Sequence, residues 1–255
     1  MAYSPAVRVE GAVVLVTGAS AGIGGAVAAQ LAARGALVLA AGRGAAATAA
    51  VAAHTGGHPL LADLSAPDGP AELAAAALDV HGRVDALVAS AGAGWRGPLT
   101  GMPAGRLDEL IMLNLRAPIL LARALVPGML ARGRGQITLL ASIAGLTGVA
   151  SESVYAATKA GLIVFAESLR LELAGSGVGV AVVSPGAVDT GFFARRGTPY
   201  DRRLPRPLDV HRVARAVVRA TERDRDVVLP RWLGVAPKVR AVLPRTYRRL
   251  ARRLG

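Results

Sequence analysis

Apolar runs typical of buried strands alternate with helix-like segments along most of the chain. The expected strands occupy residues 12–18, 36–42, 58–64, 83–92, 135–142 and 179–186. Their residues are almost continuously apolar, which is typical of parallel strands covered by helices on both faces. The sequence therefore predicts an α/β fold in which helices cover both faces of a doubly wound parallel sheet.

Length and composition exclude several classes of protein. The 255 residues fit one large α/β unit, so we expect a single domain over residues 1–255. No run of about 18 residues lacks polar breaks and the N-terminus has no basic leader, so we expect a cytoplasmic protein with neither a spanning helix nor a secretion signal. The chain has no Cys, and its four His lack ligand spacing. Disulfides are therefore excluded, and no metal site is predicted.

The net charge of +13 is confined to the last quarter of the chain. Residues 1–194 carry 12 basic and 12 acidic side chains, whereas residues 195–255 carry 18 basic and 5 acidic ones. Because no nucleic-acid-binding motif accompanies this charge, nucleic acid is not an expected partner. A plain solvated surface is the simplest interpretation, and an anion-facing tail is the sharper one.

The C-terminal segment 236–255 combines this charge with helical periodicity. Its apolar positions at helical spacing are Leu243, Tyr247, Leu250 and Leu254. The sequence therefore predicts a basic amphipathic tail. Such a tail fits peripheral contact with an anionic membrane, a subunit interface or a cover over a substrate pocket.

The segment after the first expected strand reads VLVTGASAGIGGAVA and contains Gly18, Gly22 and Gly24. Glycines at this place let the backbone turn sharply and approach a pyrophosphate, whose charge then meets the N-terminus of a helix. Tight packing between strand and helix would require the same residues. The spacing differs from G-x-G-x-x-G, but its position directly after an N-terminal strand favours nucleotide binding.

The end of the second expected strand indicates which dinucleotide would bind. An acidic residue that would hold the ribose hydroxyls of NAD is absent, because Gly42 stands there and Arg43 follows. A guanidinium can bind a 2′-phosphate by paired hydrogen bonds. We therefore expect a preference for NADP(H), with NAD(H) as the alternative.

Tyr155 and Lys159 lie four residues apart, on one face of an expected helix. A nearby ammonium favours the phenolate, so we expect it to lower the pKa of Tyr155 and make this residue an acid/base. Ser142 ends the preceding strand, at the sheet edge where open α/β sheets place their ligands. The sequence predicts that these three polar groups converge.

With these residues the chain resembles the classical short-chain dehydrogenase/reductase family, from Val13 to about Thr190. The motifs occur in family order, and they are TGASAGIG (17–24), Asp63 in ADL, ASAG (89–92), Asn114, Ser142, YAATK (155–159) and PGAVDT (185–190). The resemblance implies a Rossmann-type fold and an oxidoreductase that acts on CH–OH groups. It also implies a homodimer or homotetramer.

The resemblance implies a role for individual residues. Tyr155 would transfer the proton, Ser142 would bind the substrate oxygen, and Lys159 would hold the nicotinamide ribose. Asn114 would hold a water in a proton relay; its carbonyl lacks an α-helical donor because Pro118 has no amide proton. The implied cofactor-binding residues are Gly18, Ser20, Gly22, Ile23, Gly24, Arg43, Asp63, Leu64, Ala91, Gly92, Tyr155, Lys159, Pro185, Gly186, Val188 and Thr190.

One motif departs from the family pattern, because Ala89 and Ser90 stand where the family has two asparagines. Because alanine cannot make the amide hydrogen bonds of an asparagine, we expect weaker cofactor binding or a less stable central sheet, whereas the acid/base groups are intact. Residues 187–207 are rich in Gly and Pro and are expected to form a substrate lid. The apolar side chains of this segment and of residues 92–99 and 143–153 predict a pocket for a hydrophobic ketone or secondary alcohol. The alternative is a non-catalytic sensor or scaffold that binds a dinucleotide and acts through its basic tail.

Overall fold

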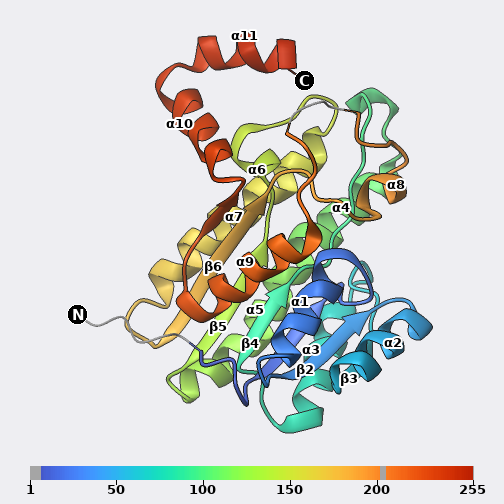
Figure 1. Ribbon diagram of the computed structural model, residues 1–255, viewed down its shortest axis with the longest axis vertical. Helices are drawn as coiled ribbons and strands as arrows, with labels where there is room; N and C mark the ends of the chain where they lie inside the picture. The colour runs from blue at the N-terminus through green and yellow to red at the C-terminus, as the bar shows by residue number, and fades with distance from the viewer. Residues whose placement is uncertain (1–6, 202–204, 255) are drawn as a thin grey trace.

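Seven parallel strands form one sheet in a computed structural model that describes residues 7–201 and 205–254 (Figure 1). The strand order is β3-β2-β1-β4-β5-β6-β7. The strands are β1 (Val13–Thr17), β2 (Leu37–Gly42), β3 (His58–Leu61), β4 (Ala86–Ala89), β5 (Gly135–Leu140), β6 (Val178–Pro185) and β7 (Val227–Leu229). The predicted doubly wound α/β fold is confirmed. The short edge strand β7 was not expected from the sequence.

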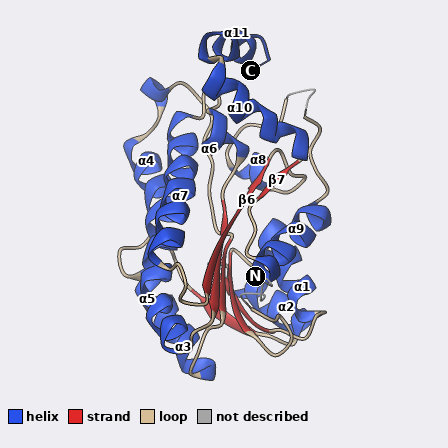
Figure 2. Ribbon diagram, turned by 90° about the vertical axis from the view of Figure 1, so that its left-hand side faces the viewer, coloured by secondary structure: helices blue, strands red, loops and turns tan. Residues whose placement is uncertain are grey.

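Helices cover both faces of the sheet (Figure 2). One face carries α1 (Gly22–Ala32), α2 (Ala45–Thr55) and α9 (Val210–Arg223). The other carries α3 (Gly69–His81), α5 (Ala117–Ala131) and α7 (Ser153–Glu172), with α4 (Ala104–Ile111) next to α7. Successive residues of a strand point to opposite faces of the sheet and pack in two separate hydrophobic cores. In β1, Leu15 packs in one core, whereas Val14 and Val16 pack in the other.

The strand order places a crevice at the carboxyl ends of β1 and β4. After β1 the chain adds β2 and β3 on one side, and it then crosses to β4 on the other side of β1. The loops that leave β1 and β4 therefore diverge, which is where open α/β sheets bind their ligands.

Residues 106–125, whose sequence suits one long helix around Asn114 and Pro118, do not form one continuous α-helix. A π-helical stretch, η2 (Met112–Arg116), separates α4 from α5, and the Ala117 N–H bonds the Met112 carbonyl five residues back. Pro118 cannot donate the α-helical bond to Asn114, so the backbone widens locally where the α-helical pattern fails.

Residues Ala104–Ala131 are long and apolar enough to span a membrane, but half of their most apolar window is buried in the fold.

The described residues of the segment after β6, 187–201 and 205–207, lie near the carboxyl edge of the sheet. This segment contains the short helix α8 (Phe192–Arg195), and Val188 pairs with Leu208 in an isolated bridge. Residues 202–204 of the predicted lid lie outside the described residues. Beyond β7 the chain forms η3 (Arg231–Gly234), α10 (Val235–Val242) and α11 (Pro244–Leu254). The predicted C-terminal helix is therefore present, but the side chains of Leu250, Arg252, Arg253 and Leu254 are not described.

Candidate active site

The glycine turn after β1 is too crowded for side chains. Gly18 has a φ of +67°, and a Cβ there would lie 2.8 Å from the Cα of Ala91. A Cβ on Gly24 would lie 2.3 Å from the Gly18 carbonyl oxygen. The N-cap residue of α1, Ala21, makes no side-chain hydrogen bond to the first helical N–H groups. The turn therefore presents backbone amides to the crevice, as a pyrophosphate requires.

The chain enters the crevice again at the end of β2, where Gly42 has no room for a side chain. A Cβ at this position would lie 2.5 Å from the Thr48 hydroxyl oxygen and 3.1 Å from the Ser20 Cβ. Because Thr48 is fully buried, it cannot move away easily. An acidic side chain therefore does not fit at position 42, and Arg43 is the charged residue of this edge that lines the cavity.

A cavity of about 1000 Å³ runs from the glycine turn to the end of β5. It gathers most of the predicted site residues. Those that line it are Gly18, Ser20, Gly22, Ile23, Gly24, Arg43, Leu64, Ala91, Gly92, Ser142, Tyr155, Lys159, Pro185, Gly186, Val188 and Thr190. Asn114 and Asp63 are not part of its wall.

Asp63 folds back on its own loop instead of facing the cavity. Its carboxylate accepts hydrogen bonds from the Ser65 hydroxyl at 2.6 Å and the Ser65 N–H at 3.0 Å. These bonds lower the pKa of Asp63 below its usual value. The neighbours Ala62 and Leu64 line the cavity in its place.

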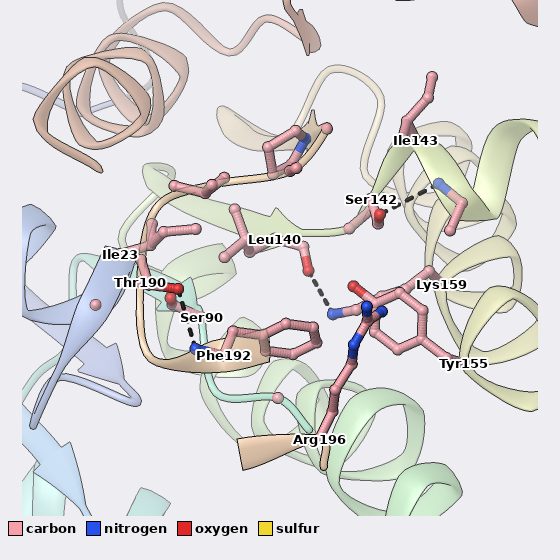
Figure 3. Close-up of a pocket in the computed structure, with 18 of the residues that line it drawn as sticks. Ile23, Ser90, Leu140, Ser142, Ile143, Tyr155, Lys159, Thr190, Phe192 and Arg196 are labelled. Carbon is pink, nitrogen blue, oxygen red and sulfur yellow. Dashed lines mark hydrogen bonds between the residues drawn. The ribbon is translucent and has the colours of Figure 1, made fainter. Parts of the chain in front are cut away.

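Ser142, Tyr155 and Lys159 lie together in the cavity wall, beside Phe192 and Arg196 (Figure 3). Ser142 caps the short helix α6 (Ile143–Thr147) by accepting the Ala144 N–H at 3.2 Å. Lys159 donates from Nζ to the Leu140 carbonyl at 2.8 Å, and its Nζ lies 5.9 Å from the centre of the Tyr155 ring. One turn of α7 and the end of β5 thus bring three polar groups to one place.

Burial determines how these groups titrate. Burial raises the pKa of Tyr155 to about 12, and a hydrogen bond with Ser142 offsets only part of this rise. Burial also lowers the pKa of Lys159 to about 8. The expectation that the Lys159 ammonium holds the pKa of Tyr155 below its ordinary value is therefore wrong, because loss of solvent raises this pKa. At neutral pH the phenol carries its proton.

Asn114 lies at the centre of η2, and its side chain is buried. Its Oδ1 accepts the Ala93 N–H at 2.9 Å, and its Nδ2 donates to the Ala93 carbonyl at 2.9 Å. Nδ2 also donates to the Thr158 hydroxyl at 3.3 Å. The side chain thus fastens the loop after β4 to the helix that carries Tyr155, a positioning role that sequence reasoning missed.

Sequence reasoning also missed a buried ion pair beside Tyr155. Arg196, which follows α8, donates from Nη1 to Glu152 Oε1 at 2.6 Å, and its side chain is only 3% exposed. Its guanidinium stacks 4.7 Å from the centre of the Phe193 ring. Since Glu152 immediately precedes α7, this pair fastens the segment after α8 to the start of α7. The two residues are 44 apart in sequence, and no local pattern links them.

The ion pair makes opposite contributions to the pKa of Tyr155, because Glu152 raises it and Arg196 lowers it. Glu152→Gln is therefore expected to lower the pKa of Tyr155, and Arg196→Met is expected to raise it. Tyrosinate absorbance, titrated against a Tyr155→Phe protein as reference, measures the shift. Shifts in the same direction for both variants would contradict the electrostatic account.

Comparisons with known proteins agree with this geometry. A sequence model described as short chain dehydrogenase matches residues 12–201. The 3-oxoacyl-[acyl-carrier-protein] reductase FabG of Escherichia coli is 36% identical over 183 residues, which cover 71% of this chain and 75% of that protein. The ketoacyl reductase HetN of Nostoc sp. is 38% identical over 149 residues, which cover 56% of this chain and only 50% of HetN. A short-chain dehydrogenase from Sphingobium yanoikuyae, solved in complex with NADPH, has a TM-score of 0.81 at 29% identity, covering 92% of this chain and 95% of that one.

Proposed function

Because this chain belongs to the short-chain dehydrogenase family, we propose that it is an NADP(H)-dependent oxidoreductase that interconverts a hydrophobic ketone and a secondary alcohol. The observation that carries the proposal is the convergence of Ser142, Tyr155 and Lys159 in the same cavity as the glycine turn. One cavity can therefore hold a dinucleotide and a carbonyl compound in contact.

The residues present fit NADP(H). The crowding at Gly18 and Gly24 keeps side chains away from these two positions, so that backbone amides can meet a pyrophosphate there. Arg43 would hold the 2′-phosphate, and Lys159 and the Pro185–Gly186 loop would lie along the nicotinamide half. The NADPH complex of the Sphingobium relative supports this assignment. When bound, the cofactor supplies or accepts the hydride.

Tyr155 would act as the general acid in ketone reduction. Its pKa of about 12 keeps the proton on the phenol at neutral pH, ready for transfer to the carbonyl oxygen as that oxygen gains negative charge. Ser142 would donate a hydrogen bond to the same oxygen. Lys159, with a pKa of about 8, would return a proton to Tyr155 at near-neutral pH.

The substrate end of the cavity is largely apolar. Val149, Phe192, Phe193 and Leu233 contribute to its wall, and Phe192 lies 5.8 Å from the Tyr155 ring, centre to centre. These surroundings favour a hydrophobic ketone. Two of the relatives are named as reductases of ketoacyl compounds, which are also ketones. The assembly into a homodimer or homotetramer and the cytoplasmic location stay predictions.

The competing function is a non-catalytic sensor or scaffold that binds the dinucleotide. A panel of hydrophobic ketones mixed with NADPH distinguishes the two, with the loss of NADPH absorbance as the signal. We expect oxidation with at least one ketone that fills the apolar end of the cavity. Tight NADPH binding without turnover of any ketone would favour the scaffold.

Arg43→Gln tests the cofactor assignment. Loss of a guanidinium that pairs with the 2′-phosphate is expected to weaken NADPH binding roughly 10-fold or more, since hydrogen bonds to charged groups contribute roughly 1.5–3 kcal/mol. NADH binding should change little, because NADH lacks that phosphate. Arg34→Gln serves as the control, because Arg34 pairs with Glu222 on the far side of α1. Equal weakening of both cofactors would overturn the role of Arg43.

A further inference from the structure

The residues after β7 form an arm at one end of the molecule. This C-terminal arm, residues 231–254, comprises η3, α10 and α11 and extends away from the sheet beyond α6 (Figures 1 and 2). Two side chains fasten it to α6. Arg240 donates to the Leu146 carbonyl at 2.9 Å, and the Tyr247 hydroxyl donates to the Thr147 carbonyl at 3.0 Å. Because α6 follows Ser142 directly, the arm is held next to the candidate active site.

The arm carries charge of one sign. No acidic residue follows Asp226, whereas eight basic residues do. Six of them have described side chains, all exposed, and they are Arg231, Lys238, Arg240, Arg245, Arg248 and Arg249. None of these six forms an ion pair within the described part of the chain. Such a surface attracts an anionic partner.

The arm also exposes large apolar side chains next to these cations. Val242 is 77% exposed, Trp232 59%, Val235 56% and Leu243 54%. Trp232 and Val235 belong to the wall of the cavity as well, together with Val239 and Tyr247. The arm therefore forms both the rim of the substrate cavity and an exposed apolar surface.

We propose that the C-terminal arm docks the protein on an anionic membrane, and that a lipophilic substrate enters the cavity from that membrane past Trp232. The docking rests on the charge and exposure of the arm, and the entry route rests on the proposed function. An anionic bilayer offers negative headgroups above an apolar layer, which matches cations interleaved with exposed Trp, Val and Leu side chains.

Partners other than a membrane fit the C-terminal arm less well. The arm of a second copy would bring equal positive charge against it. Nucleic acid offers phosphates but no apolar layer for Val242 and Leu243. An acidic protein supplies charge, and binding of such a protein without binding to vesicles would overturn the proposal.

Sedimentation of the full-length protein with vesicles tests the docking. We expect binding to vesicles that contain phosphatidylglycerol, weak binding to pure phosphatidylcholine, and loss of binding at high salt. Arg245→Gln/Arg248→Gln/Arg249→Gln should weaken binding roughly 100-fold, since each cation at an anionic surface contributes roughly fivefold. Arg212→Gln/Arg215→Gln/Arg219→Gln removes the same charge from exposed positions of α9 and should bind like the wild type.

The apolar part of the docking has its own readout. In Trp95→Phe protein the fluorescence comes from Trp232 alone, because the chain has two Trp. We expect its emission to shift to the blue with anionic vesicles, and Val242→Ser/Leu243→Ser to reduce that shift. NADPH binding and turnover of a short, water-soluble ketone should be unchanged in the two arginine variants, so failure of the docking is separable from failure of the proposed function. Binding that ignores lipid charge, or equal binding of both arginine variants, would overturn the proposal.

Discussion

Tyr155→Phe is expected to lower kcat for ketone reduction roughly 10²- to 10⁴-fold, because it removes the group proposed to transfer a proton to the substrate oxygen. Phenylalanine keeps the ring, which lies 5.8 Å from Phe192 and 5.9 Å from Lys159 Nζ, so the local packing should persist. NADPH affinity should change far less than kcat, since the glycine turn, Arg43 and Lys159 are all kept. Single-turnover kinetics and NADPH fluorescence titration measure the two quantities.

Tyr200→Phe is the matched control for this experiment. Tyr200 also lines the cavity, but its hydroxyl already donates to the Pro205 carbonyl at 2.7 Å. Its removal should lower kcat far less than Tyr155→Phe does. If Tyr155→Phe retained more than about a tenth of the wild-type rate, another group would have to supply the proton, and the proposed role would fail.

The fold was largely predictable because each buried parallel strand is a short, continuous apolar run in the sequence. Continuous apolar runs marked six of the seven strands, and the glycines at the first turn marked where the backbone must bend without side chains. The edge strand β7 was missed because its three residues, Val227–Leu229, are shorter than any reliable pattern. The π-helical stretch η2 was missed because a proline indicates a disturbed helix but not the form that the disturbance takes.

The site was predictable where its residues belong to local motifs, and it was missed where distant segments meet. The glycine turn, Ser142 and the pair Tyr155 and Lys159 all reach the predicted cavity. The pairing of Glu152 with Arg196 depends on how the lid folds over α7, which no local spacing specifies. The raised pKa of Tyr155 was missed for a related reason, because sequence shows which charges are near in the chain but not how much solvent is lost.

Lys159→Met is expected to abolish most activity and yet to stabilise the cofactor-free protein at pH 7. Burial lowers the pKa of Lys159 from 10.5 to about 8, so the folded protein holds a charge that it disfavours. The buried ammonium lowers the free energy of unfolding by its full amount below pH 8. This loss disappears as the pH rises from about 8 to 10.5, because the folded state then releases its proton before the unfolded state does. The pKa shift corresponds to at most about 3 kcal/mol, from which loss of the hydrogen bond to Leu140 subtracts about 1.

Thermal unfolding of the two proteins at pH 7 and at pH 10 checks this prediction. For a chain of this size each kcal/mol moves Tm by roughly 2–4 °C, so the variant should unfold several degrees higher at pH 7 and gain much less at pH 10. The other lysine of the chain provides the control, because Lys238 is exposed and Lys238→Met should leave Tm unchanged. A Lys159→Met protein that is less stable than the wild type at pH 7 would show that the ammonium contributes more through its bond to Leu140 than burial costs. If only the inactive Lys159→Met protein has a higher Tm, the wild-type protein keeps a buried cation that lowers its stability because the reaction needs that cation.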